Sequence, residues 1–229
     1  MTSIDQDYIN KFNMYLNAED NSEDEKVVEI QQGIKGNIAF NEVRDAMQIL
    51  LYLVIDKSYS MYGDLEEKVR QGLENIKQVI NGSYEEKHIQ IAITFFGSNL
   101  DMHPFQYVEN IDTSCEVDGS ATRLYDAVVE SCKNMISQYD SLKPIIKVSG
   151  VMLIFTDGED NGSEQYRKAK DVQTYLNELT ERDIPYIVTA FGVADLNHIG
   201  RDFNTEPRSI DDVSKLRTLM RFVSPKAVQ

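Results

Sequence analysis

The sequence predicts an α/β protein with a doubly wound, mostly parallel sheet. From about residue 46 onward, short apolar segments of strand length alternate with longer segments whose apolar residues recur at helical spacing. The first of these segments, Ile49 to Ile55, is apolar throughout. Such a run is typical of a strand that is covered on both faces, as in a parallel sheet. Strands that alternate with helices form βαβ units, so we expect helices on both faces of the sheet.

The remaining elements follow in chain order from the same two patterns. Continuous or alternating apolar residues predict four further strands, at 89–95, 103–108, 151–155 and 186–191. Apolar residues spaced three and four apart predict the helices between and after them, at 65–80, 124–135, 166–179 and 213–223. These elements place a single domain over residues 46–229.

Residues 1–45 have a different character and form an acidic N-terminal extension. Its apolar residues between Ile4 and Leu16 recur at helical spacing, which predicts a short amphipathic helix. A segment rich in Asp and Glu follows at 19–25 and is typical of a solvated loop.

The charge of the chain argues against two classes of partner. Its 229 residues include 38 acidic and 23 basic side chains, for a net charge of −15. Nucleic acids and anionic membrane surfaces attract basic proteins, so we expect neither as a partner. No apolar run has the length of a membrane-spanning helix and the first residues carry no basic segment, so we expect a cytoplasmic protein. Its two cysteines, Cys115 and Cys132, are then expected to be free thiols.

Small oxygen-bearing residues gather in three segments that link a predicted strand to the helix after it. We call these the first loop (56–61), the second loop (118–123) and the third loop (156–160); they read DKSYSM, DGSATR and TDGED. Ligands of doubly wound sheets bind outside the carboxyl ends of the strands, where these loops lie.

The residue types in the loops predict a divalent metal site. Carboxylate and hydroxyl oxygens suit hard cations, and the absence of His and Cys from the loops disfavours zinc and copper. Ser58 and Ser60 lie two residues apart and can face one ion together with Asp56 and Asp157, while Thr122 supplies an oxygen from the second loop. Mg²⁺ is the expected ion, although Mn²⁺ and Ca²⁺ accept the same ligands.

These five residues resemble the metal-ion-dependent adhesion site of von Willebrand factor type A domains. That site has the pattern D-x-S-x-S, then T, then D, which Asp56, Ser58, Ser60, Thr122 and Asp157 match in order. The resemblance covers residues 46–229 and implies a three-layer, Rossmann-like fold with a six-stranded sheet. It also implies a protein–protein interaction module whose metal binds a Glu or Asp of a partner. In general layout the chain is similar to cytoplasmic bacterial members associated with tellurite resistance and stress response, relatives of which serve as adaptors beside ATPases.

The sequence departs from the family pattern at several positions around the loops. Tyr59 and Ala121 stand where many members have Gly, although the integrin β subunits also carry a Tyr at the first position. Those subunits bind a second metal through two successive acidic residues, of which only Asp64 is present here. Asp64 with Glu67 instead has the spacing of a capping box that opens a helix.

Other side chains near the loops have expected roles around the metal. Lys57 and Arg123 are expected to contact the partner carboxylate, and Tyr59, Met61 and Tyr62 are expected to form a rim that excludes water. Asp160 is expected to be a turn residue.

Two alternatives to a binding module remain open at this stage. A magnesium-dependent phosphohydrolase also places carboxylates and a metal at strand ends. However, Ser58 stands where the haloacid-dehalogenase type needs a second Asp, and no glycine-rich phosphate loop is present. The other alternative is a structural subunit whose metal only braces the loops. We expect no enzymatic activity, and the sequence does not identify the partner or the oligomeric state.

Overall fold

The computed structural model describes residues 48–81, 86–114, 116–156, 159–190, 197–204 and 208–209. The N-terminal extension with its expected helix, the closing helix expected at 213–223, Cys115 and Asp157 lie outside these ranges. Among the described residues, no helix combines the length and the apolar character that crossing a membrane requires.

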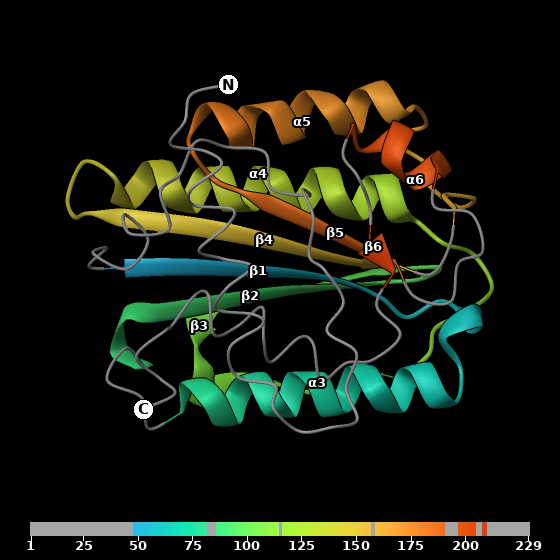
Figure 1. Ribbon diagram of the computed structural model, residues 1–229, viewed down its shortest axis with the longest axis horizontal. Helices are drawn as coiled ribbons and strands as arrows, with labels where there is room; N and C mark the ends of the chain where they lie inside the picture. The colour runs from blue at the N-terminus through green and yellow to red at the C-terminus, as the bar shows by residue number, and fades with distance from the viewer. Residues whose placement is uncertain are drawn as a thin grey trace, which may run out of the picture.

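Six strands form one sheet at the centre of the molecule (Figure 1). Their order across the sheet is β3-β2-β1-β4-β5-β6, and β3 alone pairs in antiparallel fashion, with β2. The strands are β1 (Gln48–Asp56), β2 (Ile89–Phe96), β3 (Leu100–Tyr107), β4 (Val148–Thr156), β5 (Tyr186–Ala190) and β6 (Arg208–Ser209). The order reverses between β1 and β4, and ligands of doubly wound sheets bind at this point.

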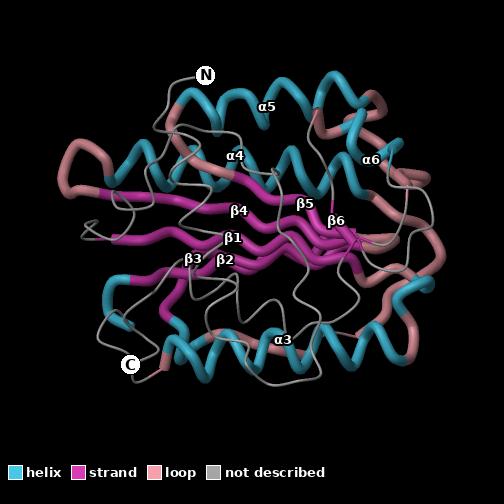
Figure 2. Tube along the Cα trace, in the orientation of Figure 1, coloured by secondary structure: helices cyan, strands magenta, loops and turns pink. Residues whose placement is uncertain are grey.

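Helices cover both faces of the sheet and give the molecule three layers (Figure 2). Helix α3 (Asp64–Ile80) covers one face, and α4 (Leu124–Leu142), α5 (Ala169–Glu181) and α6 (Asn197–Asp202) cover the other. Three short 3₁₀ segments lie in the connections: η1 (Tyr59–Met61), η2 (Glu86–His88) and η3 (Val108–Asn110). The predicted α/β class, the layers and the six-stranded sheet are thereby confirmed.

The side chains of β1 alternate between two apolar cores. Leu51 and Leu53 belong to the cluster that includes the buried face of α3, whereas Leu50 and Val54 belong to the cluster under α4 and α5. Every residue of β1 is buried, which explains why its segment from Ile49 to Ile55 is apolar throughout and lacks the alternation of a half-exposed strand. Tyr52, also in β1, satisfies its buried hydroxyl with a 3.0 Å hydrogen bond to the hydroxyl of Thr94.

Several predicted boundaries are wrong in detail. Helix α5 begins at Ala169, so Tyr166 precedes it, and β3 begins at Leu100 rather than 103. Strand β6 has two residues and α6 has six, and the apolar pattern predicted neither. Both are too short for their apolar spacing to repeat often enough to be recognised.

The expected capping box at Asp64 and Glu67 does not form. The N-cap of α3 is Gly63, whose φ of 89° and ψ of −122° suit glycine and are strained for residues with a Cβ. Asp64 is therefore already the first residue of the helix. The carboxylate of Glu67 accepts hydrogen bonds from Arg70 and Gln71 on the following turn instead of reaching back to the cap.

Candidate metal site

The candidate site lies where β1 and β4 end side by side. The two strands pair in parallel with Ile55 opposite Phe155, so Asp56 and Thr156 end neighbouring strands. The hydroxyl of Thr156 donates a 2.9 Å hydrogen bond to Oδ2 of Asp56. Both residues are fully buried. The predicted position of the first loop, at the carboxyl end of the first strand of the sheet in chain order, is therefore confirmed.

The first loop folds back on the carboxylate that opens it. The backbone N–H of Ser58 donates a 2.8 Å hydrogen bond to Oδ1 of Asp56, so its own loop and the neighbouring strand β4 together orient the carboxylate. The hydroxyl oxygens of Ser58 and Ser60 lie 3.1 Å apart. Ser58 is buried and Ser60 is exposed, so the pair leads from the buried carboxylate toward solvent.

Backbone hydrogen bonds join the first loop to the second. The N–H of Tyr59 donates to the carbonyl oxygen of Gly119 over 2.9 Å, and the N–H of Asp118 donates to the carbonyl oxygen of Lys57 over 2.8 Å. Because backbone atoms make these contacts, they depend little on which side chains occupy the loops. The serine hydroxyls are thus held beside the loop that carries Thr122.

The second loop is joined at Thr122 to the residues that follow the third loop. Its N–H donates a 2.7 Å hydrogen bond to Oδ1 of Asn161, and its carbonyl oxygen accepts from the N–H groups of Asn161 and Gly162 over 3.1 and 3.0 Å. A Cβ at position 162 would lie 2.9 Å from the Cβ of Ala121, closer than such atoms approach one another, so glycine permits this contact. The side chain of Thr122 is buried where these two segments meet.

The structure thus brings together the parts of the predicted site that it describes. Asp56, Ser58 and Ser60 lie on one loop, and Thr122 lies on a second loop bonded to it. The fifth predicted ligand, Asp157, lies outside the described residues, and metal binding by the set stays a prediction. Within the described ranges, no cluster of three or more His, Cys, Asp or Glu side chains is placed to hold a metal ion. The candidate site differs from such a cluster because most of its donors are hydroxyl groups.

The two cations expected to contact a partner carboxylate have acidic neighbours on this chain. Arg123 Nη2 lies 2.7 Å from Oδ2 of Asp126 and 3.6 Å from Oε2 of Glu164. Lys57 Nζ lies 3.9 Å from Oδ2 of Asp101, a longer and weaker ion pair. Arg123 is therefore engaged within the chain, and Lys57 is the cation with the looser contact.

The expected rim of the site is only partly correct. Tyr59 and Tyr62 are 67% and 69% exposed, and their rings stack with centroids 6.0 Å apart and planes 7° from parallel. Met61 between them is 1% exposed and belongs to the core cluster on the α3 side of the sheet. One turn of 3₁₀ helix places successive side chains about 120° apart, so it turns Met61 inward while both tyrosines face solvent.

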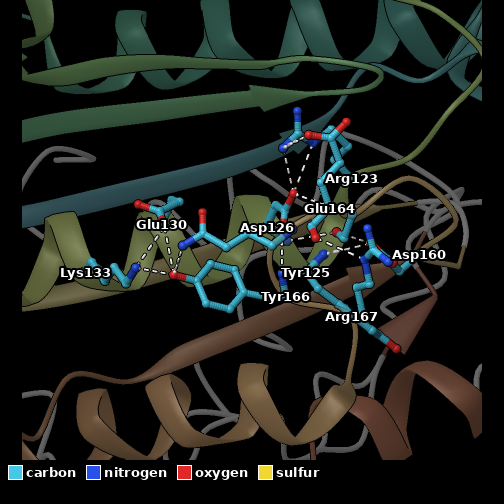
Figure 3. A network of polar contacts seen from close by, with 11 residues as sticks. Arg123, Tyr125, Asp126, Glu130, Lys133, Asp160, Glu164, Tyr166 and Arg167 are labelled. Carbon is cyan, nitrogen blue, oxygen red and sulfur yellow. Dashed lines mark hydrogen bonds and ion pairs between the residues drawn. The ribbon is translucent and has the colours of Figure 1, made fainter.

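A polar network at the start of α4 includes residues that sequence reasoning missed (Figure 3). Asp126 is buried, and its carboxylate accepts hydrogen bonds from the segment 164–166, which follows the third loop. Asp160 accepts from the N–H of Tyr125 and from the hydroxyl of Ser163, so it does more than shape a turn. A signal for Asp126 was present, since an acid between Leu124 and the apolar run 127–129 interrupts the buried face of a helix.

The surroundings of Asp126 and Asp160 shift the pKa values of their carboxyl groups in opposite directions. Burial alone would raise the pKa of Asp126, but the N–H groups of Glu164 and Tyr166 and the guanidinium of Arg123 together lower it from its ordinary value of 3.8. Burial raises the pKa of Asp160 above the same ordinary value, against the hydrogen bonds from Ser163 and Tyr125. Asp126 is therefore the carboxylate that its surroundings stabilise in the charged form.

Comparison with protein families decides the family. The sequence model of the von Willebrand factor type A domain matches residues 51–222, which is most of the chain. The chain belongs to this family. A search of curated proteins finds no match.

Solved structures of other proteins share the fold of this von Willebrand factor type A domain. The pilus adhesin SpaC from Lactobacillus rhamnosus GG, in its open conformation, superposes with a TM-score of 0.62 at 11% identity over 80% of this chain and 31% of that one. Manganese-loaded TRAP protein of Plasmodium vivax gives 0.57 at 17% identity over 77% and 74%. Proximal thread matrix protein 1 from the mussel byssus, with a zinc-occupied MIDAS motif, gives 0.50 at 14% identity over 78% and 45%. The chain thus spans less than half the length of the first and third of these proteins.

Proposed function

We propose that this domain is a protein-interaction module that binds an acidic side chain of a partner protein through a divalent cation. Asp56, Ser58, Ser60, Thr122 and Asp157 would hold the ion, as in the metal-ion-dependent adhesion site that their sequence pattern resembles. A pilus adhesin and two proteins solved with manganese or zinc are among the structures with this fold, which supports a binding role of this kind.

The observation that carries the proposal is the orientation of Asp56. Its carboxylate is fully buried at the end of the central strand, and hydrogen bonds from Ser58 and Thr156 to its two oxygens fix its plane. A buried carboxylate is costly unless hydrogen bonds or a cation compensate for its lost hydration. The hydroxyl groups of Ser58 and Ser60, 3.1 Å apart on the same loop, add neutral oxygen donors beside it. The donors of this site therefore fit a hard divalent cation.

The charge of the donor set supports a partner carboxylate. Two carboxylates, from Asp56 and Asp157, balance one divalent ion, and the three hydroxyl groups add no charge. When bound, the ion supplies an electrophilic centre that favours an anionic oxygen over water. A partner carboxylate has to approach a chain of net charge −15, which repels it. The bound ion would therefore attract the carboxylate only close to the site. Lys57 adds a cation within the first loop.

The exposed tyrosines beside the first loop support a protein partner. Tyr59 follows Ser58 directly, and its ring stacks on that of Tyr62 with most of both side chains in solvent. Aromatic side chains are enriched at the energetic centres of protein interfaces because they bury much area with few rotatable bonds. We propose that this tyrosine pair forms one side of the partner-binding surface.

We further propose that Mg²⁺ is the physiological ion, that the domain has no enzymatic activity and that it works in the cytoplasm. Oxygen-only donors support Mg²⁺, and Ser58 in place of a second Asp supports the absence of phosphohydrolase chemistry. The likeness in layout to cytoplasmic bacterial members supports a role in a stress-response or ATPase-adaptor complex. Hydrolysis of p-nitrophenyl phosphate in Mg²⁺ that is lost in Asp56→Asn would contradict the non-enzymatic proposal.

The binding proposal is tested with the metal first and the partner second. Calorimetric titration with MgCl₂ should show one site in the wild type and none in Asp56→Asn. The immobilised domain should then retain a protein from a lysate in Mg²⁺, release it in EDTA, and lose it in Asp56→Asn and Thr122→Ala. Asp140→Asn, at the far end of α4 where Asp140 contacts Arg182, is the matched control and should behave as the wild type. Equal retention in excess EDTA would refute the metal-dependent mechanism.

A further inference from the structure

The N-terminus of α4 receives its caps from a distant loop. The first N–H groups of a helix have no carbonyl partner within the helix, and the N-cap residue here, Arg123, makes no capping hydrogen bond with its side chain. Instead, the N–H of Tyr125 donates to Oδ1 of Asp160 and the N–H of Asp126 donates to the hydroxyl of Ser163, both over 3.0 Å. The segment that follows β4 in the sequence thus completes the start of α4 (Figure 3).

Asp126 makes the reciprocal contacts from the helix to the loop. Its Oδ2 accepts from the N–H of Glu164 over 2.9 Å, and its Oδ1 accepts from the N–H groups of Gln165 and Tyr166 over 3.1 and 2.8 Å. Arg123 adds a 2.7 Å contact to Oδ2. Three successive backbone N–H groups that point at one carboxylate form an anion-binding nest, and the bound anion here is a side chain of the protein itself.

We call these contacts between the start of α4 and residues 160–166 the α4 joint. Its position connects it to the candidate metal site. Thr122 lies four residues before Asp126, at the point where the second loop enters α4. The segment that the carboxylate of Asp126 holds is continuous with Asn161 and Gly162, which bond the backbone of Thr122 on both sides. The described residues that lead into this segment begin at residue 159, two positions after Asp157 in the sequence.

We propose that Asp126 is a positioning residue that fixes the second loop relative to the segment 159–166 and thereby sets the metal affinity of the site. This inference rests on the proposed function, since it concerns the ion that the site would hold. Without the Asp126 carboxylate, three N–H groups at 164–166 lose their acceptor. The segment 159–166 then keeps the caps from Asp160 and Ser163 and the contacts to Thr122. It also keeps the hydrogen bonds of the Tyr166 hydroxyl with Glu130 and Lys133 and the ion pair of Glu164 with Arg123, but these contacts are made by side chains and do not hold its backbone.

Asp126 acts on the site without reaching an ion. Its oxygens are occupied by the N–H groups of 164–166 and by Arg123, so its contribution passes through the backbone. Residues that orient metal ligands typically change metal affinity about 10- to 100-fold when they are replaced. Asp126→Asn keeps the size of the side chain and removes the charge and one acceptor oxygen. We expect it to weaken binding by about ten-fold or more in line with that range.

The test compares Asp126→Asn with Asp140→Asn on the same helix. Asp140 also binds an arginine, Arg182, over 3.0 Å, but it lies at the other end of α4. The affinity for Mn²⁺ is measured by calorimetry in both variants and in the wild type. Amide hydrogen exchange of the metal-free proteins is measured in parallel. Asp126→Asn should lose about ten-fold in affinity and should exchange faster at Thr122 and throughout 159–166. Asp140→Asn should do neither.

Each other outcome has a definite meaning. A folded Asp126→Asn with wild-type Mn²⁺ affinity overturns the positioning role while leaving the proposed function intact. If the wild type binds neither Mn²⁺ nor Mg²⁺, the proposed function fails. Amide exchange still tests the positioning role in that case, because unchanged exchange at Thr122 in Asp126→Asn overturns it. If Asp126→Asn does not fold, both measurements are made on Ser163→Ala instead. That variant removes the hydrogen bond from the N–H of Asp126 to the Ser163 hydroxyl. Unchanged affinity and exchange in that variant overturn the proposal.

Discussion

The hydroxyl of Thr156 donates a hydrogen bond to Oδ2 of Asp56 across the junction where the sheet order reverses. One residue ends β4 and the other ends β1, and each is fully buried. The carboxylate is therefore oriented by the sheet as well as by its own loop, through the N–H of Ser58. An orientation set by the sheet is rigid before any ligand arrives, and such preorganisation favours tight binding.

Replacement of Thr156 by Val should destabilise the metal-free domain. Valine keeps the shape of threonine but removes one donor to a buried carboxylate, and hydrogen bonds to charged groups contribute about 1.5–3 kcal/mol. We expect the free energy of unfolding, measured by urea denaturation in EDTA, to fall by about that amount. Thr174→Val is the control, because Thr174 is exposed on α5 and bonds only its own helix backbone. A loss in Thr156→Val no larger than in the control would contradict the role assigned to this hydroxyl.

The tyrosine pair and the methionine between them should respond differently to truncation. Tyr59 and Tyr62 are mostly in solvent, so the Tyr59→Ala and Tyr62→Ala double variant should lose about 1 kcal/mol or less, the range of one aromatic pair. Met61 is buried in the core, and truncation of such a side chain to Ala costs about 2–5 kcal/mol. Thermal denaturation of the two variants checks the order of the effects. Similar losses in both would mean that the tyrosines support the fold and are not kept for a partner.

The sequence predicted the fold well where elements were long and their burial was uniform. The continuous apolar run of β1 and the helical spacing in α3 and α4 gave the correct elements, because each of these elements spans several periods of its pattern. Strand β6 and helix α6 were missed because two and six residues are too few for the apolar spacing to repeat. The segment before α5 was misread as helix because Tyr166 fits the apolar spacing of that helix, although Asp126 accepts a hydrogen bond from the N–H of Tyr166 outside it.

The candidate site was predictable in composition but not in its supporting contacts. Asp56, Ser58, Ser60 and Thr122 follow from residue type and loop position, and the structure places them on loops that are bonded together. The pairing of Arg123 with Asp126 and the burial of Met61 depend on which way short segments turn in space. The caps that Asp160 and Ser163 supply to α4 span 35 and 37 residues, whereas capping motifs in a sequence are recognised only over a few.

The α4 joint should weaken in acid through Asp126. Its pKa in the folded protein lies below the ordinary 3.8, so its contribution to stability is present above that pH and is lost as the pH falls through the lower, folded value. Asp160 has a raised pKa, so the cost of its charge appears as the pH rises through the higher, folded value. Arg123 and Glu164 are the other charged groups that face Asp126.

Urea denaturation between about pH 3 and 6 separates the two carboxyl groups. The stability deficit of Asp126→Asn relative to the wild type should grow as the pH rises through this range. The difference for Asp160→Asn should change in the opposite direction, because that substitution removes a charge whose burial is unfavourable. Parallel curves for the wild type and both variants would show that neither carboxyl group changes its pKa on folding.

A divalent ion should stabilise the domain because it binds the folded protein and not the unfolded chain. A ligand that binds only the folded protein adds about 2.7 kcal/mol at a concentration of 100 times its Kd, and the gain continues to rise with the logarithm of concentration. Thermal denaturation in increasing MgCl₂ should therefore raise the Tm of the wild type steadily. The Tm of Asp56→Asn should not respond, and Thr122→Ala should need more metal for the same shift. An equal rise in the wild type and Asp56→Asn would assign the effect to general ion screening rather than to this site.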